Sequence, residues 1–128
     1  MRDAVARIRA VLPADVGAFL ADRTTREVVV LNLFVAIQEC LDLASHWLAD
    51  AGWDVPRGYR ELFVALADHG VLERGLALRL GGAAALRNLL AHRYGTLDWS
   101  RIHAVASSDL GDLEALCAAL AQVVGDGA

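Results

Sequence analysis

The sequence is poor in residues that interrupt or cross-link a chain: its 128 residues include two prolines, two cysteines and only 6% aromatic residues. So few prolines, together with 56% hydrophobic residues, exclude an extended disordered chain, because this composition is ample for a packed core. Cys40 and Cys117 fall within apolar patterns. They could pair, but we expect free buried thiols in a reducing compartment.

Long apolar runs are also missing. Apolar runs such as residues 28–31 and 81–86 are far shorter than the roughly 20 residues of a membrane-spanning helix. The N-terminus contains Arg2, Asp3, Arg7 and Arg9 and lacks the apolar stretch of a signal peptide. We therefore expect a cytoplasmic protein with no membrane partner.

Lysine is absent, and all twelve basic residues are arginine. Sixteen acidic residues bring the net charge to −4, which argues against non-specific binding of nucleic acid. The charge is uneven, however. Residues 74–108 hold five arginines and one acid, a net +4, whereas the rest holds seven arginines and fifteen acids, a net −8. The basic segment is therefore the part of the chain that a polyanion could approach.

Apolar residues recur at three- and four-residue steps, which predicts an all-α protein. The longest such pattern, from Leu33 to Leu48, is preceded by Thr24-x-x-Glu27, a sequence typical of a capping box. Proline removes a backbone donor, so we expect the first helix to be kinked near Pro13. These helices would form an antiparallel up-and-down bundle of about five helices in a single domain, residues 1–128. The predicted ranges are 2–21, 24–51, 57–69, 73–92, a short helix at 99–106, and 109–124.

Four glycines carry different signals. Gly52 and Gly70 follow predicted helices and are expected to end them. Gly81 and Gly82 lie inside the helix predicted at 73–92, where each costs about 1 kcal/mol relative to alanine. The pair indicates either a kink or the close approach of another helix. If that helix belonged to a second copy of the chain, the segment would lie on a dimer interface.

Beyond the glycines, Arg87, His92 and Tyr94 suit metal-free cleavage of RNA. The ribose 2′-hydroxyl must lose a proton and the leaving 5′-oxygen must gain one, which a histidine can do near neutral pH. Arginine can stabilise the extra negative charge on the phosphate, and tyrosine can stack on a base or hydrogen-bond phosphate. The simpler alternative is that Arg87 and His92 only complement the dipole at the end of a helix.

Helical geometry limits what this spacing can achieve. At 100° per residue, Arg87 and Tyr94 lie about 20° apart around the helix, whereas His92 lies about 140° from Arg87. An unbroken helix would therefore not gather all three side chains. Either the helix ends or distorts around His92, or a second copy completes the site across a two-fold axis.

The pattern Arg87-Asn88-x-x-x-His92-x-Tyr94 resembles the Arg-x4–6-His signature of HEPN domains, in the form with a following tyrosine that marks HepT-like toxins. The resemblance covers about residues 23–105. The other segments that carry it are Asn32-Leu33, Ala36-Ile37-Gln38, Cys40, Asp42 to His46, Pro56, Tyr59-Arg60-Glu61, Phe63, Gly70-Val71 and Leu86 to Tyr94.

This resemblance implies a HEPN-like, homodimeric helical bundle with the motifs of two subunits facing each other in a cleft. It implies a toxin that acts as a metal-independent endoribonuclease, with no cofactor. It also implies a partner, the nucleotidyltransferase antitoxin MntA, which neutralises the toxin by transferring AMP to the motif tyrosine. By position, Arg87 would stabilise the transition state, His92 would act as acid and base, and Tyr94 would be modified, with Asn88 and Arg93 in support. Bulk and negative charge added at Tyr94 would block the cleft and repel RNA.

Asp42 and His46 lie four residues apart and so share a helix face. They could form a pair that supports the cleft, or a pair that only holds the bundle together. No cluster of His, Cys and Asp predicts a metal site, which would need three or four ligands. Two other functions stay open: a non-catalytic binding or accessory subunit of a minimal nucleotidyltransferase, and a purely structural dimer.

Overall fold

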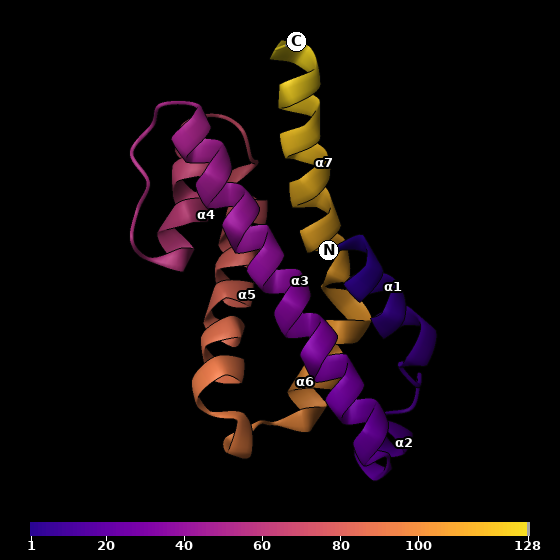
Figure 1. Cartoon of the computed structure of the whole chain (residues 1–128). Helices are drawn as coiled ribbons and strands as arrows, with labels where there is room; N and C mark the ends of the chain where they lie inside the picture. Colours follow the sequence, from indigo (N-terminus) through magenta and orange to yellow (C-terminus); the bar gives the residue numbers. More distant parts are fainter. Residues whose placement is uncertain (128) are drawn as a thin grey trace.

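Helices make up most of the chain in the computed structural model, which describes the backbone of residues 1–127 and the side chains of residues 1–121. The predicted all-α fold is confirmed, with no strand in this described part. It has seven α-helices rather than about five (Figure 1). The elements are α1 (Arg2–Val11), α2 (Val16–Ala21), α3 (Arg23–Asp50), α4 (Tyr59–Asp68), α5 (Arg74–His92), the 3-10 turn η1 (Tyr94–Thr96), α6 (Trp99–Ser108) and α7 (Leu110–Gly127).

The 28-residue helix α3 crosses the bundle diagonally and packs against each of the other six α-helices of the described chain. In Figure 1, α4 and α5 lie on one side of α3, and α1 and α7 lie on the other. Apolar side chains on successive turns of α3 fill the core between these layers. Its buried residues are Val29, Val30, Asn32, Leu33, Ala36, Ile37, Cys40, Leu41, Ala44 and Leu48.

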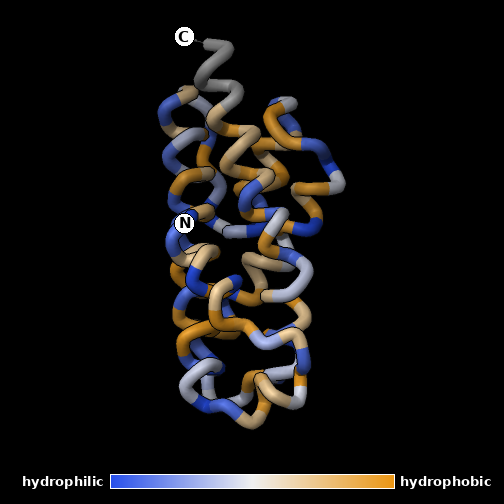
Figure 2. The backbone as a smooth tube through the Cα atoms, turned by 90° about the vertical axis from the view of Figure 1, so that its right-hand side faces the viewer, coloured by the Kyte–Doolittle hydropathy of each residue, from blue (hydrophilic) through white to orange (hydrophobic). Residues whose placement is uncertain are grey.

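By length and composition alone, α3 could also cross a membrane, although its apolar residues form no long unbroken run. Half of its most apolar window is buried inside the bundle, which is the pattern of a core helix. Figure 2 shows hydrophobic and hydrophilic stretches alternating along the helices, as amphipathic packing requires. We therefore assign α3 to the protein core.

Pro13 ends the first helix instead of kinking it, so the prediction of one helix over residues 2–21 is wrong. The residue before a proline is pushed out of the helical conformation, and Leu12 has an extended backbone with φ −68° and ψ 117°. A new helix, α2, then begins after Asp15, whose carboxylate accepts a hydrogen bond from the amide of Ala18 at 3.0 Å. The chain therefore turns between α1 and α2, and the periodicity of apolar residues alone does not predict this turn.

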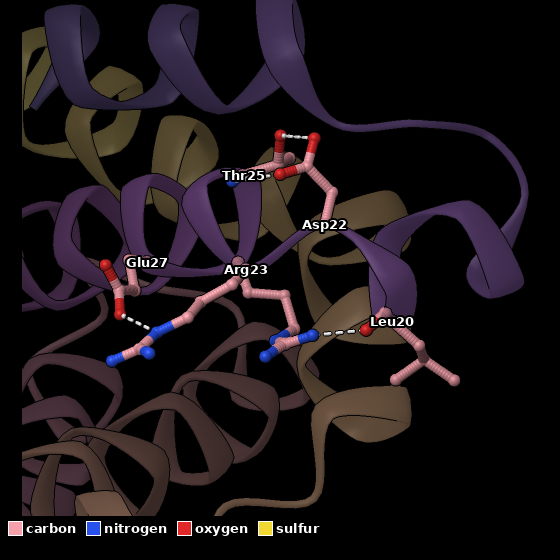
Figure 3. Close-up of polar contacts among 6 residues, drawn as sticks. Leu20, Asp22, Arg23, Thr25 and Glu27 are labelled. Carbon is pink, nitrogen blue, oxygen red and sulfur yellow. Dashed lines mark hydrogen bonds and ion pairs between the residues drawn. The ribbon is translucent and has the colours of Figure 1, made fainter.

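The N-terminus of α3 is capped by Asp22, not by the predicted Thr24–Glu27 box. The Asp22 carboxylate accepts from the Thr25 amide at 3.1 Å and from the Thr25 hydroxyl at 2.7 Å (Figure 3). Glu27 instead pairs with Arg23 at 2.9 Å, one helical turn earlier. An aspartate two residues before Thr24 competes successfully because its two oxygens satisfy two donors at once.

Gly52 and Gly70 both have φ +77°, a conformation that favours glycine, and they follow the ends of α3 and α4 as predicted. Asp98 caps α6 by accepting from the amides of Ser100 and Arg101. The two glycine turns and the Asp98 cap fix where these helices end and begin around the motif.

Gly81 makes room for a side chain and does not interrupt α5, which runs unbroken from Arg74 to His92. A Cβ at Gly81 would lie 3.2 Å from Cγ of Arg60 on α4, so the close approach comes from the same chain. A Cβ at Gly82 would meet nothing within 4 Å. The Gly81 face is therefore covered by α4 and is not open to a second copy.

The two cysteines are free thiols, as predicted, with Cys40 buried in α3 and Cys117 partly buried in α7. Burial, followed by the charge of the neighbouring Cys117, raises the pKa of Cys40 to about 12. The Cys40 thiol is therefore protonated at neutral pH and acts as an apolar core residue.

Replacing Asp22 with alanine should lower the thermal midpoint by a few degrees, because both donors of Thr25 lose their acceptor. Hydrogen bonds from the side chain and then the amide of Thr25 hold the pKa of Asp22 below its ordinary 3.8. The stabilisation is therefore present above pH 3.8 and is lost as the pH falls through the lowered pKa. Thermal melts of Asp22→Ala and wild type should converge in acid. The exposed loop variant Asp54→Ala is the control, and an unchanged midpoint at neutral pH would contradict the assignment of this cap.

Candidate functional site

The motif lies where α5 ends. The helix stops at His92, and Arg93 leaves the helical conformation with φ −135° and ψ 37° while its amide still bonds the carbonyl of Leu89 at 2.8 Å. Tyr94 then begins the 3-10 turn η1, which the Thr96 amide closes by donating to the carbonyl of Arg93 at 3.0 Å. Helical geometry allowed either a helix that ends or distorts around His92 or a site completed by a second copy. The structure shows that the helix does end at His92.

Arg87 is half-buried and firmly oriented by its neighbours. Its Nε donates to Oε1 of Gln38 at 2.7 Å, and Nη1 contacts Oδ1 of Asn88 at 3.3 Å. The guanidinium carbon lies 4.9 Å from the ring centre of Tyr59 and 5.3 Å from that of Phe34. Two aromatic faces and one strong hydrogen bond thus hold a permanent positive charge in place while leaving several of its donors available.

Asp42 supports Arg87 through Gln38, not through His46. The amide nitrogen of Gln38 donates to Oδ1 of Asp42 at 2.9 Å, so the chain Asp42–Gln38–Arg87 fixes which end of the Gln38 amide faces the arginine. His46 lies instead 3.3 Å from Asp50, one turn further along α3, with 77% of its side chain exposed. In a helix, Asp42 and His46 each have one neighbour four residues before them and one four residues after them. They do not pair with each other: Asp42 pairs with Gln38, and His46 pairs with Asp50.

His92 is exposed on the side of α5 away from Arg87. It lines an open depression of about 470 Å³ together with Asn88, Leu89, Arg93 and Arg101. Because Arg87 contacts α3 and α4 while His92 does not share those contacts, one chain does not bring the two side chains together. The roughly 140° separation expected on a regular helix is thus retained.

Tyr94 lies on the Arg87 side and is 47% exposed. Its ring meets Trp99 edge to face at 6.1 Å, and Trp99 in turn packs against the guanidinium of Arg26 at 5.2 Å. Tyr94 also forms one wall of an open groove between α3 and α5 that includes Phe34, the ring beneath Arg87. Phe34 therefore links the surroundings of Arg87 to those of Tyr94.

The positive charge predicted for residues 74–108 is concentrated at the motif. Arg74 and Arg79 are neutralised by ion pairs with Asp68 and Asp112. Among the side chains that the structure describes, the remaining three arginines of this segment form no ion pair; these are Arg87, Arg93 and Arg101. The unpaired positive charges therefore lie next to His92 and Tyr94, where an anionic substrate would be attracted.

Sequence reasoning missed the roles of Gln38, Phe34, Tyr59 and Trp99. These residues contact the motif from α3, α4 and α6, over sequence separations that no local pattern encodes. One signal was available for two of them, since Phe34 and Gln38 are four residues apart and share a face of the long helix. No group of three or more His, Cys, Asp or Glu residues that could hold a metal occurs among residues 1–121.

Comparison with known proteins agrees with this geometry. The family described as ribonuclease HepT-like matches residues 1–120 of the chain. An mRNA nuclease HepT from Shewanella oneidensis is 29% identical over 100 residues, covering 78% of this chain and 75% of the relative.

Two solved structures have closely similar folds. One contains a tri-AMPylated HEPN toxin of Shewanella oneidensis in complex with an MNT antitoxin, and it matches with a TM-score of 0.86 at 26% identity over 94% of this chain and 90% of that one. The other is a toxin–antitoxin structure with AMP-PNP, which matches with a TM-score of 0.83 at 26% identity over 93% and 90% of the two chains. With the family match extending over nearly the whole sequence, the chain belongs to the HepT-like ribonuclease family of HEPN proteins.

Proposed function

We propose that this chain is the toxin of a toxin–antitoxin pair and cleaves RNA without a metal ion, acting in the cytoplasm. The observation that carries the proposal is the state of Arg87, a half-buried arginine held by Gln38 and two aromatic rings with no acidic partner in the described structure. The HepT-like family and the mRNA nuclease from Shewanella oneidensis support this assignment.

The residues at the end of α5 suit the chemistry of cyclising cleavage. His92 would accept the proton of the ribose 2′-hydroxyl, whose oxygen then forms a bond to the adjacent phosphorus. The bond from phosphorus to the 5′-oxygen breaks, and that oxygen receives a proton, which leaves a 2′,3′-cyclic phosphate and a 5′-hydroxyl. Arg87 would stabilise the extra negative charge on the phosphate oxygens as they pass through the transition state.

A homodimer would complete the site. Asn88 is exposed and lies between Arg87 and His92 around α5. A second copy packed against Asn88 across a two-fold axis would meet both side chains and place two Arg87–His92 sets in one cleft. The Gly81 face does not compete for that role, since Arg60 of the same chain covers it.

Control by an antitoxin would act at Tyr94. A nucleotidyltransferase of the MNT type, such as the one in complex with the Shewanella oneidensis toxin, would transfer AMP to this chain. The Tyr94 hydroxyl oxygen forms a bond to the α-phosphorus of ATP, pyrophosphate leaves, and the phenolic proton passes to solvent or a base. The added phosphate introduces negative charge beside the unpaired arginines and weakens their attraction for RNA.

Expression of the chain alone should arrest bacterial growth, and Arg87→Ala or His92→Ala should relieve the arrest. Loss of a proton-transferring residue typically slows cleavage by about 10²- to 10⁴-fold. The matched control is His46→Ala, which removes an equally exposed histidine from α3 and should stay toxic. Growth counts and 5′-end mapping of cellular RNA provide the measurements. Harmless expression of the folded wild-type chain would favour the accessory-subunit alternative.

Gln38→Leu should reduce RNA cleavage about tenfold or more, because a hydrogen bond to a charged group contributes about 1.5–3 kcal/mol. Asp42→Ala should have a smaller effect, since Gln38 can still accept from Arg87 after losing its own support. The expected order of cleavage rates is wild type, then Asp42→Ala, then Gln38→Leu, at similar thermal midpoints. Equal rates in all three would show that Gln38 does not position Arg87.

Co-expression with a nucleotidyltransferase encoded beside this chain should raise the intact mass by whole AMP units and restore growth. Tyr94→Phe removes the accepting oxygen and should abolish the increase while the partner still binds. Tyr59→Phe is the control, because Tyr59 packs on Arg87 as a ring and should leave the modification unchanged. An AMP adduct that survives Tyr94→Phe would place the acceptor elsewhere.

A further inference from the structure

An apolar groove runs beside Tyr94 between the N-terminal half of α3 and the last turns of α5. Its lining residues are Glu27, Val30, Leu31, Phe34, Leu90, Ala91 and Tyr94. The groove measures about 420 Å³, within the range of roughly 300–1,000 Å³ that is typical of small-molecule sites. Leu31 is 63% exposed at its surface, so its side chain is available to a ligand in the groove.

One charged residue, Glu27, lines this groove, and it pairs with Arg23 at 2.9 Å (Figure 3). The pKa of Arg23 is raised first by that hydrogen bond. The groove thus combines an apolar floor, an aromatic wall at Phe34 and a single charge that is already paired.

We propose that this groove is a binding site for the adenine ring of an AMP carried by Tyr94. The flat base would lie against Phe34 and Leu31, next to the Tyr94 side chain that carries it. This inference rests on the proposed modification of Tyr94 and adds to it a defined place for the nucleotide.

Tethering favours this occupant over a free ligand. A base attached to Tyr94 is held at a high effective concentration beside the groove, so even a shallow apolar surface binds it. Stacking on an aromatic ring needs no sequence-specific contact, which suits a groove with so few polar groups. The depression that contains His92 is a poorer site for a base tethered to Tyr94, because Tyr94 does not line it.

Binding in the groove would change how the modification inhibits. The ring of Phe34 faces both the groove and the guanidinium of Arg87. An adenine stacked there occupies the space next to Arg87 through which a ribose and its base would approach. Inhibition then comes from occupancy of the substrate surface as well as from added negative charge, and the phosphodiester held against the groove becomes less accessible to hydrolysing enzymes.

The test uses the full chain modified by an MNT-type nucleotidyltransferase with isotope-labelled ATP. Mass spectrometry first establishes that AMP is on Tyr94. Nuclear Overhauser contacts should then connect the adenine protons to the methyl groups of Leu31 and Leu90. Leu31→Ser should remove these contacts and speed release of AMP by a non-specific phosphodiesterase by roughly threefold to tenfold, as expected when a base loses part of its stacking surface.

The matched control is Leu78→Ser, which alters a similarly exposed leucine, at 69%, on α5 outside the groove. It should leave both the contacts and the release rate unchanged. A modified Tyr94 whose adenine shows no contact with Leu31 or Leu90 would overturn the adenine site and leave the proposed toxin function intact. A change in oligomeric mass on Leu31→Ser without such contacts would show that a second copy covers the groove, which also overturns it. Absence of AMP from Tyr94 would overturn this inference together with the proposed modification.

Discussion

Helix α3 contacts each of the other six α-helices of the described chain, and its two faces have different functions in the structure. One face buries leucine, isoleucine and valine side chains in the core. The other presents Phe34, Gln38 and Asp42, which hold Arg87 in position. Because both faces belong to one rigid element, burial of the core and orientation of the arginine are a single packing event. Arg87 is therefore fixed by the same free energy that folds the protein.

The motif at the end of α5 shows how helix geometry separates residues that are close in sequence. Arg87 and Tyr94 share Phe34 as a neighbour, whereas His92 lies with Arg93 and Arg101 in a different depression. In a single chain, the guanidinium of Arg87 and the ring of His92 therefore point to different sides of the helix. The proposed homodimer would bring them into one cleft without any distortion of α5.

Much of this architecture could be predicted from the sequence because it depends on local signals. Apolar periodicity located α3, α4, α5 and α7 to within a few residues, and Gly52 and Gly70 ended helices as their conformational freedom allows. The errors arose where two local solutions compete. Pro13 could kink a helix or end it, and Asp22 and Thr24 could each cap α3. In both places the outcome depends on local backbone conformation and on which carboxylate meets its donors, and neither leaves a periodic trace in the sequence.

The support of Arg87 could be predicted only in part, for a related reason. Asp42 was recognisable as a polar residue on a useful face, but its partner was Gln38 and not His46, since neighbours four residues away exist in both directions. The aromatic rings of Tyr59 and Phe34 reach Arg87 from separate helices. Such contacts become visible only when the helices are placed side by side in space.

Core and site residues alternate along α3, so insertions and deletions within this helix are poorly tolerated. Leu33 and Ile37 belong to the core, and Phe34 and Gln38 follow them directly at the site. One inserted or deleted residue between positions 33 and 38 would rotate everything beyond it by about 100°, so that core and site would fail together. In the loop between Gly52 and Gly58, Trp53 packs against the core, but the exposed residues Asp54 and Val55 after it carry neither role, so the loop can vary in length there at little cost. Relatives of this protein should therefore differ by insertions at the turns while α3 keeps its residue count.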